Sequence, residues 1–448
     1  MTQRKCFLSN RFFLITQVDR FEYKLLILCI NFVNKNYMFK IKRLPEKFTS
    51  LIIGFQIYFD DLQWIHFQSL LISLLITPYK STISGMVKVL GFGTHRSKHN
   101  AFLINLSKVI IKVLRLYAEN LLTLLKKSGE PIYFIIDDTT NRKRGKHITG
   151  AYKCFDHISK TYIWGQQIVC SVILYRNILI PYSFDVYIPK QQCDNLKIKF
   201  RKKTQIALEQ LKAFESDEGT TVFVLADTFY ATKDVIEYCR LKKQHFVSCL
   251  KYNRKFRING RLTSISSYIK NTIRTFKNKT KIKIGKTKYH TVKKQVILKT
   301  GGVVKLVFSK HTSHSTAMVL FTTTTTLPSI KILEAYRKRW NIEVFFKMSK
   351  QHLGFNAYQS RELKAINSHI ALSMLSHNLL THAYITSLRE KGKSLTKKNI
   401  SKFSVLDMLN NIRYESNIDT INYCIENIST TSKNKLKNKF KELLNKAA

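Results

Sequence analysis

The stretch PIYFIIDDTT, residues 131–140, decides the fold of this chain. Its first six residues are apolar without interruption, a pattern that predicts a strand buried on both faces of a sheet. The run ends at Asp137 and Asp138, and a second run, Val222–Ala226, ends in the same way at Asp227. Ligands of open α/β sheets collect beyond the carboxyl ends of the strands. The two runs therefore predict a group of acids at one edge of a sheet.

The surrounding sequence alternates between strand-like and helical patterns. Two strand-like runs are joined by Arg176-Asn177, residues typical of a hairpin turn. Strands that alternate with helices after an initial meander predict a mixed α/β sheet. The further predicted segments are strands over 167–175, 178–187 and 245–250, and helices over 202–214 and 232–241.

The charge of the chain is strongly positive. Its 448 residues hold 76 Lys and Arg against 28 Asp and Glu, a formal net charge of +48. At 44 % hydrophobic the chain can bury a core, which excludes a disordered basic tail. A folded protein this basic predicts a polyanionic partner, and we expect a nucleic acid. A Lys-rich genome would explain the many lysines but not the scarcity of acids.

Several classes of protein are excluded by the same composition. The eight Cys form no C-x-x-C pair, so neither a disulfide framework nor a zinc knuckle is predicted, and the histidines lack partners at zinc spacing. No apolar run is long enough for a membrane span, so we expect no membrane partner. Residues 1–37 lack a clean signal-peptide layout and are compatible with an extended or misread start.

Residues 238–333 contain 22 Lys and Arg and no Asp or Glu. Alternation over 281–284, 292–298 and 303–308, with Gly301-Gly302 as a turn, predicts an antiparallel sheet with one cationic face. Solvated faces normally mix both signs of charge. We therefore interpret this face as a platform for the DNA backbone, with an ordinary solvated lysine face as the alternative. Its DNA-binding residues, here called the platform lysines, are Lys281, Lys283, Lys293 and Lys294.

Residues 329–352 predict one strong helix. At 100° per residue, four polar positions fall on a face about 60° wide, while apolar residues occupy much of the remaining circumference. A helix that is apolar in several directions is buried, so this polar strip is expected to face a site rather than open water. A solvent-facing strip with incidental ion pairs is the alternative. The four residues are Tyr336, Arg339, Glu343 and Lys350.

Three blocks of the sequence resemble the DDE transposases of bacterial insertion sequences, in the group with the Tyr-Arg-Glu-Lys helix signature (insertion-sequence family four type). The blocks are Ile136–Thr140, Leu225–Tyr230 and Tyr336–Gly354, and the third is the most specific. The resemblance covers residues 45–380. It implies an α/β fold in which an RNase H-like catalytic core is interrupted by a β-rich insertion, with helical N-terminal and C-terminal regions.

The resemblance also implies which acids act. Asp138, Asp227 and Glu343 would be the catalytic carboxylates and the metal ligands, holding two Mg²⁺ ions, with Mn²⁺ as a substitute. Asp137 competes with Asp138. We prefer Asp138 because the acid of the family directly precedes the Thr.

The implied partner is double-stranded DNA, namely the terminal inverted repeats of an insertion sequence and a target DNA. Tyr336, Arg339 and Lys350 would contact phosphates and bases near the cut. The activity would be metal-dependent DNA cleavage followed by strand transfer, carried out by a homodimer on paired ends in the bacterial cytoplasm, associated with the nucleoid. Two alternatives stay open, a non-catalytic DNA-binding protein derived from a transposase and an RNase H-like nuclease without strand transfer.

The expected domains follow from these patterns. Residues 1–130 hold 19 basic and 7 acidic residues and predict a helical DNA-end-binding region, as a helix-turn-helix or as a plain bundle. Residues 131–250 form the first part of the core, 251–302 the basic β-rich insertion, and 303–385 the second part of the core with the Glu343 helix. Residues 386–448 form a helical C-terminal region and a candidate dimerisation region.

Overall fold

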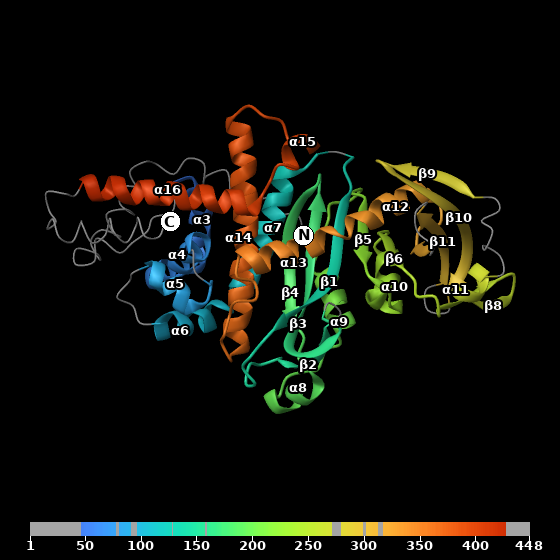
Figure 1. The fold of residues 1–448 in the computed structure, drawn as a ribbon, viewed down its shortest axis with the longest axis horizontal. Coiled ribbons are helices and arrows are strands. Elements are labelled where there is room, and N and C mark those ends of the chain that lie inside the picture. Colours follow the sequence, from blue (N-terminus) through green and yellow to red (C-terminus); the bar gives the residue numbers. More distant parts are fainter. Residues whose placement is uncertain are drawn as a thin grey trace. The chain divides into compact units, whose positions relative to one another are not determined.

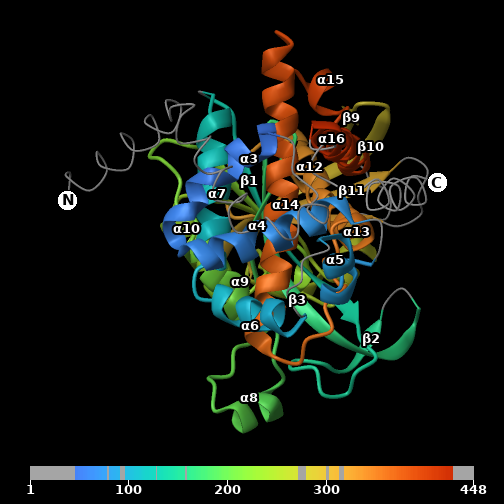
Figure 2. The ribbon, with the colours of Figure 1, turned by 90° about the vertical axis from the view of Figure 1, so that its left-hand side faces the viewer.

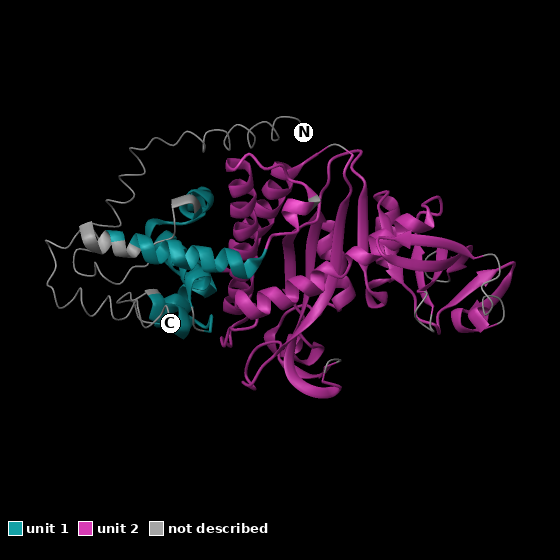
Figure 3. Cartoon of the chain, turned by 45° about the horizontal axis from the view of Figure 1, so that its top comes forward, with its two compact units in different colours: residues 1–105, 404–448 teal, residues 106–403 magenta. Residues whose placement is uncertain are grey.

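The computed structural model describes residues 46–77, 80–90, 96–127, 129–156, 159–270, 279–298, 302–311 and 317–426. The chain divides into two compact units, coloured separately in Figure 3. Unit 1 consists of Met1–Asn105 with Ser404–Ala448, and unit 2 of Leu106–Phe403. The expected start at residues 1–37 and the turn residue Gly301 lie outside the described residues.

The described residues of unit 1 are mainly helical, in keeping with the predicted fold class. Asp60 begins α4 (Asp61–Ile76) as its N-cap, because its side chain accepts a hydrogen bond from the Gln63 N–H at 2.8 Å. Phe59, Trp64 and Phe67 stack on one another and form an aromatic core. Residues 91–95, between α5 and α6, are outside the described ranges, so the helix-turn-helix stays a prediction. The other helices are α3 (Glu46–Ile52), η2 (Ile53–Tyr58), α5 (Ile83–Leu90), α6 (Arg96–Leu106) and α16 (Val405–Glu426).

Unit 2 is built on one mixed sheet, which confirms the predicted α/β class. Twelve strands among the described residues join it (Figure 1). The apolar run that is followed by two acids forms the first half of β1 (Ile132–Arg142), an interior strand of this sheet. It pairs antiparallel with β3 (Thr161–Tyr175) and parallel with β5 (Val222–Ala226), and β5 pairs parallel with β6 (His245–Cys249).

The predicted hairpin is confirmed. Arg176 and Asn177 join β3 to β4 (Ile178–Val186) with φ of 49° and 64°, the two positive values that a two-residue type I′ turn requires. The short strand β2 (Tyr152–Asp156), which pairs with the start of β3, was not predicted.

Helices cover both faces of the sheet. Phe134 and Ile136 of β1 belong to the core that also contains Ala207 of α9 (Lys203–Lys212) and Val235 of α10 (Lys233–Leu241). The opposite face of β1 contacts the helices that follow residue 329. Helices α7 (Ile110–Leu125) and α14 (Leu363–Glu390) contact each other and β4 (Figure 2). The short helices are α8 (Lys190–Leu196), η3 (Thr228–Tyr230), α11 (Ile265–Tyr268) and α15 (Lys397–Ile400).

No helix among the residues that the structure describes is both long and apolar enough to cross a bilayer.

The acid-free segment forms strands that continue the sheet of the core. Phe321 of β12 (Met318–Thr322) pairs with Ser248 of β6, so backbone pairing joins the strands of the acid-free segment to the core sheet. The prediction of one cationic face was wrong, because Lys293 and Lys294 are consecutive in β10 (Thr287–Leu298) and therefore lie on opposite faces. The other strands are β7 (Lys255–Ile258), β8 (Arg261–Ser264), β9 (Thr280–Ile284) and β11 (Gly302–His311).

The single helix predicted over 329–352 is two helices. The first, α12 (Ser329–Lys338), and the second, α13 (Asn341–His352), meet at Arg339-Trp340. The backbone there stays right-handed but tightens, since the Arg339 N–H bonds the Tyr336 carbonyl at 3.0 Å, three residues back.

Candidate active site

The acids of the two buried strands lie at the same level of the sheet, but only β5 ends before its acid. The strand predicted to stop at Asp137 continues to Arg142, because its second half stays paired with β3. Ile136 of β1 stands opposite Ala226 of β5 in the parallel register, so Asp137 lies within β1 where Asp227 follows β5. Asp227 accepts hydrogen bonds from the N–H groups of Phe229 at 2.8 Å and Tyr230 at 3.4 Å. Adjacent residues of a strand point to opposite faces, and the side chains of Asp137 and Asp138 therefore have different neighbours.

Asp137 lies on the face of the sheet that α12 and α13 cover. The Arg339 guanidinium reaches its Oδ2 at 2.7 Å and the Oε1 of Glu343 at 2.5 Å. The Arg339 and Asp137 side chains are each 16 % exposed. One buried arginine, 202 residues from Asp137 in the sequence, thus links an acid of β1 to the acid of α13.

Asp138 lies on the other face, beside α9 and η3. Its Oδ2 pairs with the Lys203 ammonium at 2.9 Å, and its Oδ1 accepts a hydrogen bond from the Tyr230 hydroxyl at 2.7 Å. The same ammonium lies 4.6 Å from the centre of the Phe229 ring. Both carboxylate oxygens of Asp138 therefore have a partner, one of them a cation.

Burial leaves these acids short of compensating charge. It raises the pKa of Asp137 to about 7, although Arg339 opposes the shift, and the Asp227 carboxylate adds to it. The pKa of Asp227 is also raised, first by burial and then by the charge of Asp138, while hydrogen bonds from Phe229 and Tyr230 oppose the rise. The carboxylates of Asp137 and Asp138 thus repel that of Asp227, and an added cation would reduce this repulsion.

The donor set fits Mg²⁺ in its chemistry, because hard carboxylate oxygens with unbalanced negative charge are the ligands that this ion takes. Within the described ranges, however, no three His, Cys, Asp or Glu side chains come together closely enough to hold a metal ion. Arg339 and Lys203 occupy carboxylate oxygens instead. Glu343 is tied to Asp137 on one face of β1, whereas Asp138 lies on the other face, so the structure does not bring Asp138 and Glu343 together and their convergence with Asp227 on a metal stays a prediction.

The other residues of the helix signature are also engaged inside the protein. Lys350 donates to the Thr139 hydroxyl at 2.7 Å and to the Thr140 carbonyl at 2.8 Å, and burial lowers its pKa to about 8. Tyr336 shares a hydrogen bond with the Cys249 thiol, and burial raises the pKa of its hydroxyl. The signature therefore lines the acid edge of the sheet, as the sequence predicted.

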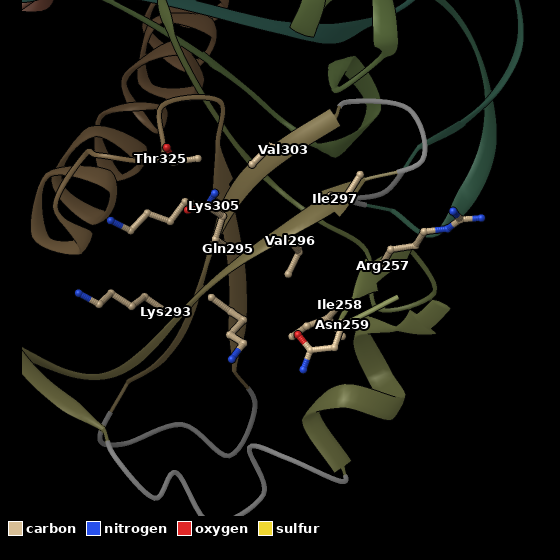
Figure 4. A pocket seen from close by; sticks show the side chains of 11 residues that line it. Arg257, Ile258, Asn259, Lys293, Gln295, Val296, Ile297, Val303, Lys305 and Thr325 are labelled. Atoms are coloured by element: carbon tan, nitrogen blue, oxygen red, sulfur yellow. The ribbon is translucent and has the colours of Figure 1, made fainter. Parts of the chain in front are cut away.

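A hollow with a volume of about 700 Å³ lies on the strands of the acid-free segment, residues 238–333. Figure 4 shows Arg257, Lys293 and Lys305 among the side chains that line it, with Ile297 and Val303 between them. All four platform lysines are exposed, and of these Lys293 and Lys294 line this hollow. Its lining contains no acid, so its charge suits a polyanion.

Two family models match the chain. The model described as Transposase DDE domain matches residues 201–379, which include Asp227 and Glu343. The model described as DDE superfamily endonuclease matches residues 59–268, which include Asp137, Asp138 and Asp227. Both matches support a DDE-type transposase. No curated relative matches it.

These matches confirm the predicted resemblance to DDE transposases and the prediction of a transposase-type nuclease. The narrower Tyr-Arg-Glu-Lys group stays a prediction. Such domains imply a DNA partner and generally use a divalent metal. The two matched ranges overlap over residues 201–268, and Asp227 lies in the part of the transposase domain that both describe.

Two residues of the transposase domain were not assigned from the sequence. Lys203 and Tyr230 hold Asp138, and both come from segments distant in sequence from it. A weak signal existed for Lys203. It is the first residue of a helix, where a cation is disfavoured by the helix dipole, so a nearby acid could have been expected.

Proposed function

We propose that this chain is a transposase that binds the terminal inverted repeats of an insertion sequence, cleaves the DNA at its ends and joins them to target DNA. The observation that carries the proposal is the placement of acids of β1 beside Asp227, which follows the parallel strand β5, with Glu343 tied to Asp137 through Arg339. The family matches support the same activity. We propose further that it acts as a homodimer on paired ends.

Asp138, Asp227 and Glu343 are the proposed ligands of two Mg²⁺ ions, for which Mn²⁺ can substitute, and Asp137 is the competing ligand. When bound, the metal would supply charge stabilisation at the scissile phosphate and activate the attacking oxygen. The residues of the chain would shield the site from water and position the DNA. Burial of the carboxyl groups excludes water and strengthens their charge interactions.

Arg339 is proposed to hold a phosphate of the DNA end. Its planar guanidinium can give two parallel hydrogen bonds to one phosphate, whereas in the DNA-free chain it donates one bond each to Asp137 and Glu343. Tyr336 and Lys350 are proposed to contact the same end. The platform lysines and the hollow beside them would hold the DNA backbone further away, and residues 1–130 would bind the terminal repeat.

The test is cleavage of DNA that carries the inverted repeats flanking the gene, with Mg²⁺ present. We expect Glu343→Gln to reduce the rate by at least about 10³-fold, the order of magnitude found when a catalytic group is removed. Glu334→Gln, a similar change on α12, is the matched control and should cut normally. Equal cutting by wild type and Glu343→Gln would refute the role of Glu343.

Two further comparisons complete the test. Asp138→Asn and Asp137→Asn are assayed side by side, and loss of cutting in only one of them identifies the ligand. Cutting without joining in a strand-transfer assay would indicate an RNase H-like nuclease, and binding without cutting under any divalent ion would indicate a non-catalytic DNA-binding protein.

A further inference from the structure

We propose that Lys203 is a positioning residue that alternates between two partners. In the DNA-free chain its ammonium neutralises Asp138, and when DNA is bound it passes to a backbone phosphate, so that metal and DNA bind cooperatively. This inference rests on the proposed function, since it assigns Asp138 to a metal site.

The first support is the competition for Asp138. The Tyr230 hydroxyl donates to Oδ1 and the Lys203 ammonium contacts Oδ2 at 2.9 Å. A hydroxyl donor leaves the charge of the carboxylate intact, whereas an ammonium cancels it. A divalent cation at Asp138 therefore has to displace Lys203 or bind against its charge.

The second support is the position of Lys203 itself. It is the first residue of α9, where the helix dipole repels a cation, so its own helix does not favour the charge there. The Asp138 carboxylate and the face of Phe229 are the groups that hold it. A phosphate offers the same kind of partner as a carboxylate, with more negative charge.

The third support is access. The Lys203 side chain keeps 16 % and that of Asp138 18 % of their exposure. Phe229, over which the ammonium lies, is 47 % exposed. The pair is therefore largely buried but not sealed from solvent, as an exchange of partners requires.

The experiment measures Mn²⁺ affinity of the full chain by isothermal titration calorimetry, with and without a blunt-ended, mixed-sequence DNA duplex at fixed salt. Three variants are compared with wild type. Lys203→Gln removes the charge and Lys203→Arg keeps it. Lys202→Gln removes the charge of the exposed neighbour and is the matched control.

We expect Lys203→Gln to bind Mn²⁺ about three- to tenfold more tightly than wild type without DNA, the range that a partly exposed ion pair allows. Because coupling between two ligands is reciprocal, the gain in Mn²⁺ affinity caused by DNA should shrink by a similar factor in this variant. Lys203→Arg and Lys202→Gln should behave as wild type.

Equal Mn²⁺ affinity of Lys203→Gln and Lys202→Gln in the DNA-free chain would overturn the proposal, as would an unchanged effect of DNA. Thermal unfolding of each protein verifies folding, and Lys203→Met replaces the Gln variant if that variant does not fold. If no protein bound Mn²⁺ with or without DNA, the proposed function would fail as well. Metal binding by wild type with an unaltered Lys203→Gln would refute only the role of Lys203.

Discussion

Replacing Arg339 by Met should destabilise the metal-free chain at pH 8 and much less at pH 5. The substitution leaves Asp137 and Glu343 without their shared cation. Opposite charges 4 Å apart attract by about 4 kcal/mol at an effective dielectric constant of 20. Removing one partner of a fully buried pair costs about 3 to 5 kcal/mol. Because both side chains keep 16 % exposure, solvent screens part of this, and we expect a loss of about 2 to 3 kcal/mol at pH 8.

The dependence on pH follows from the carboxyl group that is left behind. Burial already raises the pKa of Asp137 to about 7, and Arg339 opposes that rise, so removing the arginine raises the pKa further. The unfolded value is about 3.9. A folded-state pKa above the unfolded one means that stability from this group is complete below about pH 4 and is lost as the pH rises through the folded value. At pH 5 Asp137 takes up a proton, and the loss should fall below about 1 kcal/mol.

The assay is urea denaturation of each protein at pH 5 and pH 8 in the presence of a chelator. Lys347→Met, at an exposed position of α13, is the control and should change stability little at either pH. The double variant Asp137→Asn/Arg339→Met lacks the orphaned acid and should regain at least about 1 kcal/mol over Arg339→Met at pH 8. A loss of equal size at both pH values, or a double variant no more stable than the single one, would refute the reasoning.

Three further outcomes are expected. Changing the four platform lysines to Glu should reduce the slope of log K against log salt for DNA binding by about 0.9 for each phosphate that is no longer neutralised. An unchanged slope would mean that these lysines form an ordinary solvated surface and do not contact the DNA backbone. Burial lowers the pKa of Lys143 to about 7, so the wild type should lose stability as the pH falls from about 10 through 7, and Lys143→Met should flatten that dependence in urea denaturation. Gly150→Ala should lower the melting temperature more than Gly219→Ala, because both positions have positive φ (79° and 77°) but only at Gly150 would a Cβ lie 2.8 Å from Ile188 Cδ1.

The strands of the core could be predicted because their signal is local. An apolar run such as Ile132–Ile136 specifies burial on both faces without reference to any other part of the chain. Strand β2 carries no such signal, since its residues Lys153 and Phe155 are exposed and its place depends on pairing with β3. The break at Arg339-Trp340 has no Gly or Pro to announce it.

The acids of the candidate site could be predicted, but their partners could not. Alternation along β1 requires Asp137 and Asp138 to face opposite sides. Whether Glu343 lies on the face of Asp137 or of Asp138 depends on how α13 packs on the sheet, and the local sequence pattern does not predict that packing. Lys203 is 65 residues from Asp138, so only the folded chain brings the two together.

The continuity of the sheet fixes the distance between the acids of β1 and the platform lysines of β10, and so between the proposed sites of DNA cleavage and DNA backbone contact. From β1 the hydrogen-bonded order runs through β5, β6, β12 and β11 to β10, five steps of about 4.8 Å each. That path is about 24 Å, or roughly seven base pairs of B-DNA. The number of strands between β1 and β10 would therefore set the distance between the cleavage site and the second DNA contact. Adding or deleting a pair of these strands would change that distance along the duplex without weakening the contact.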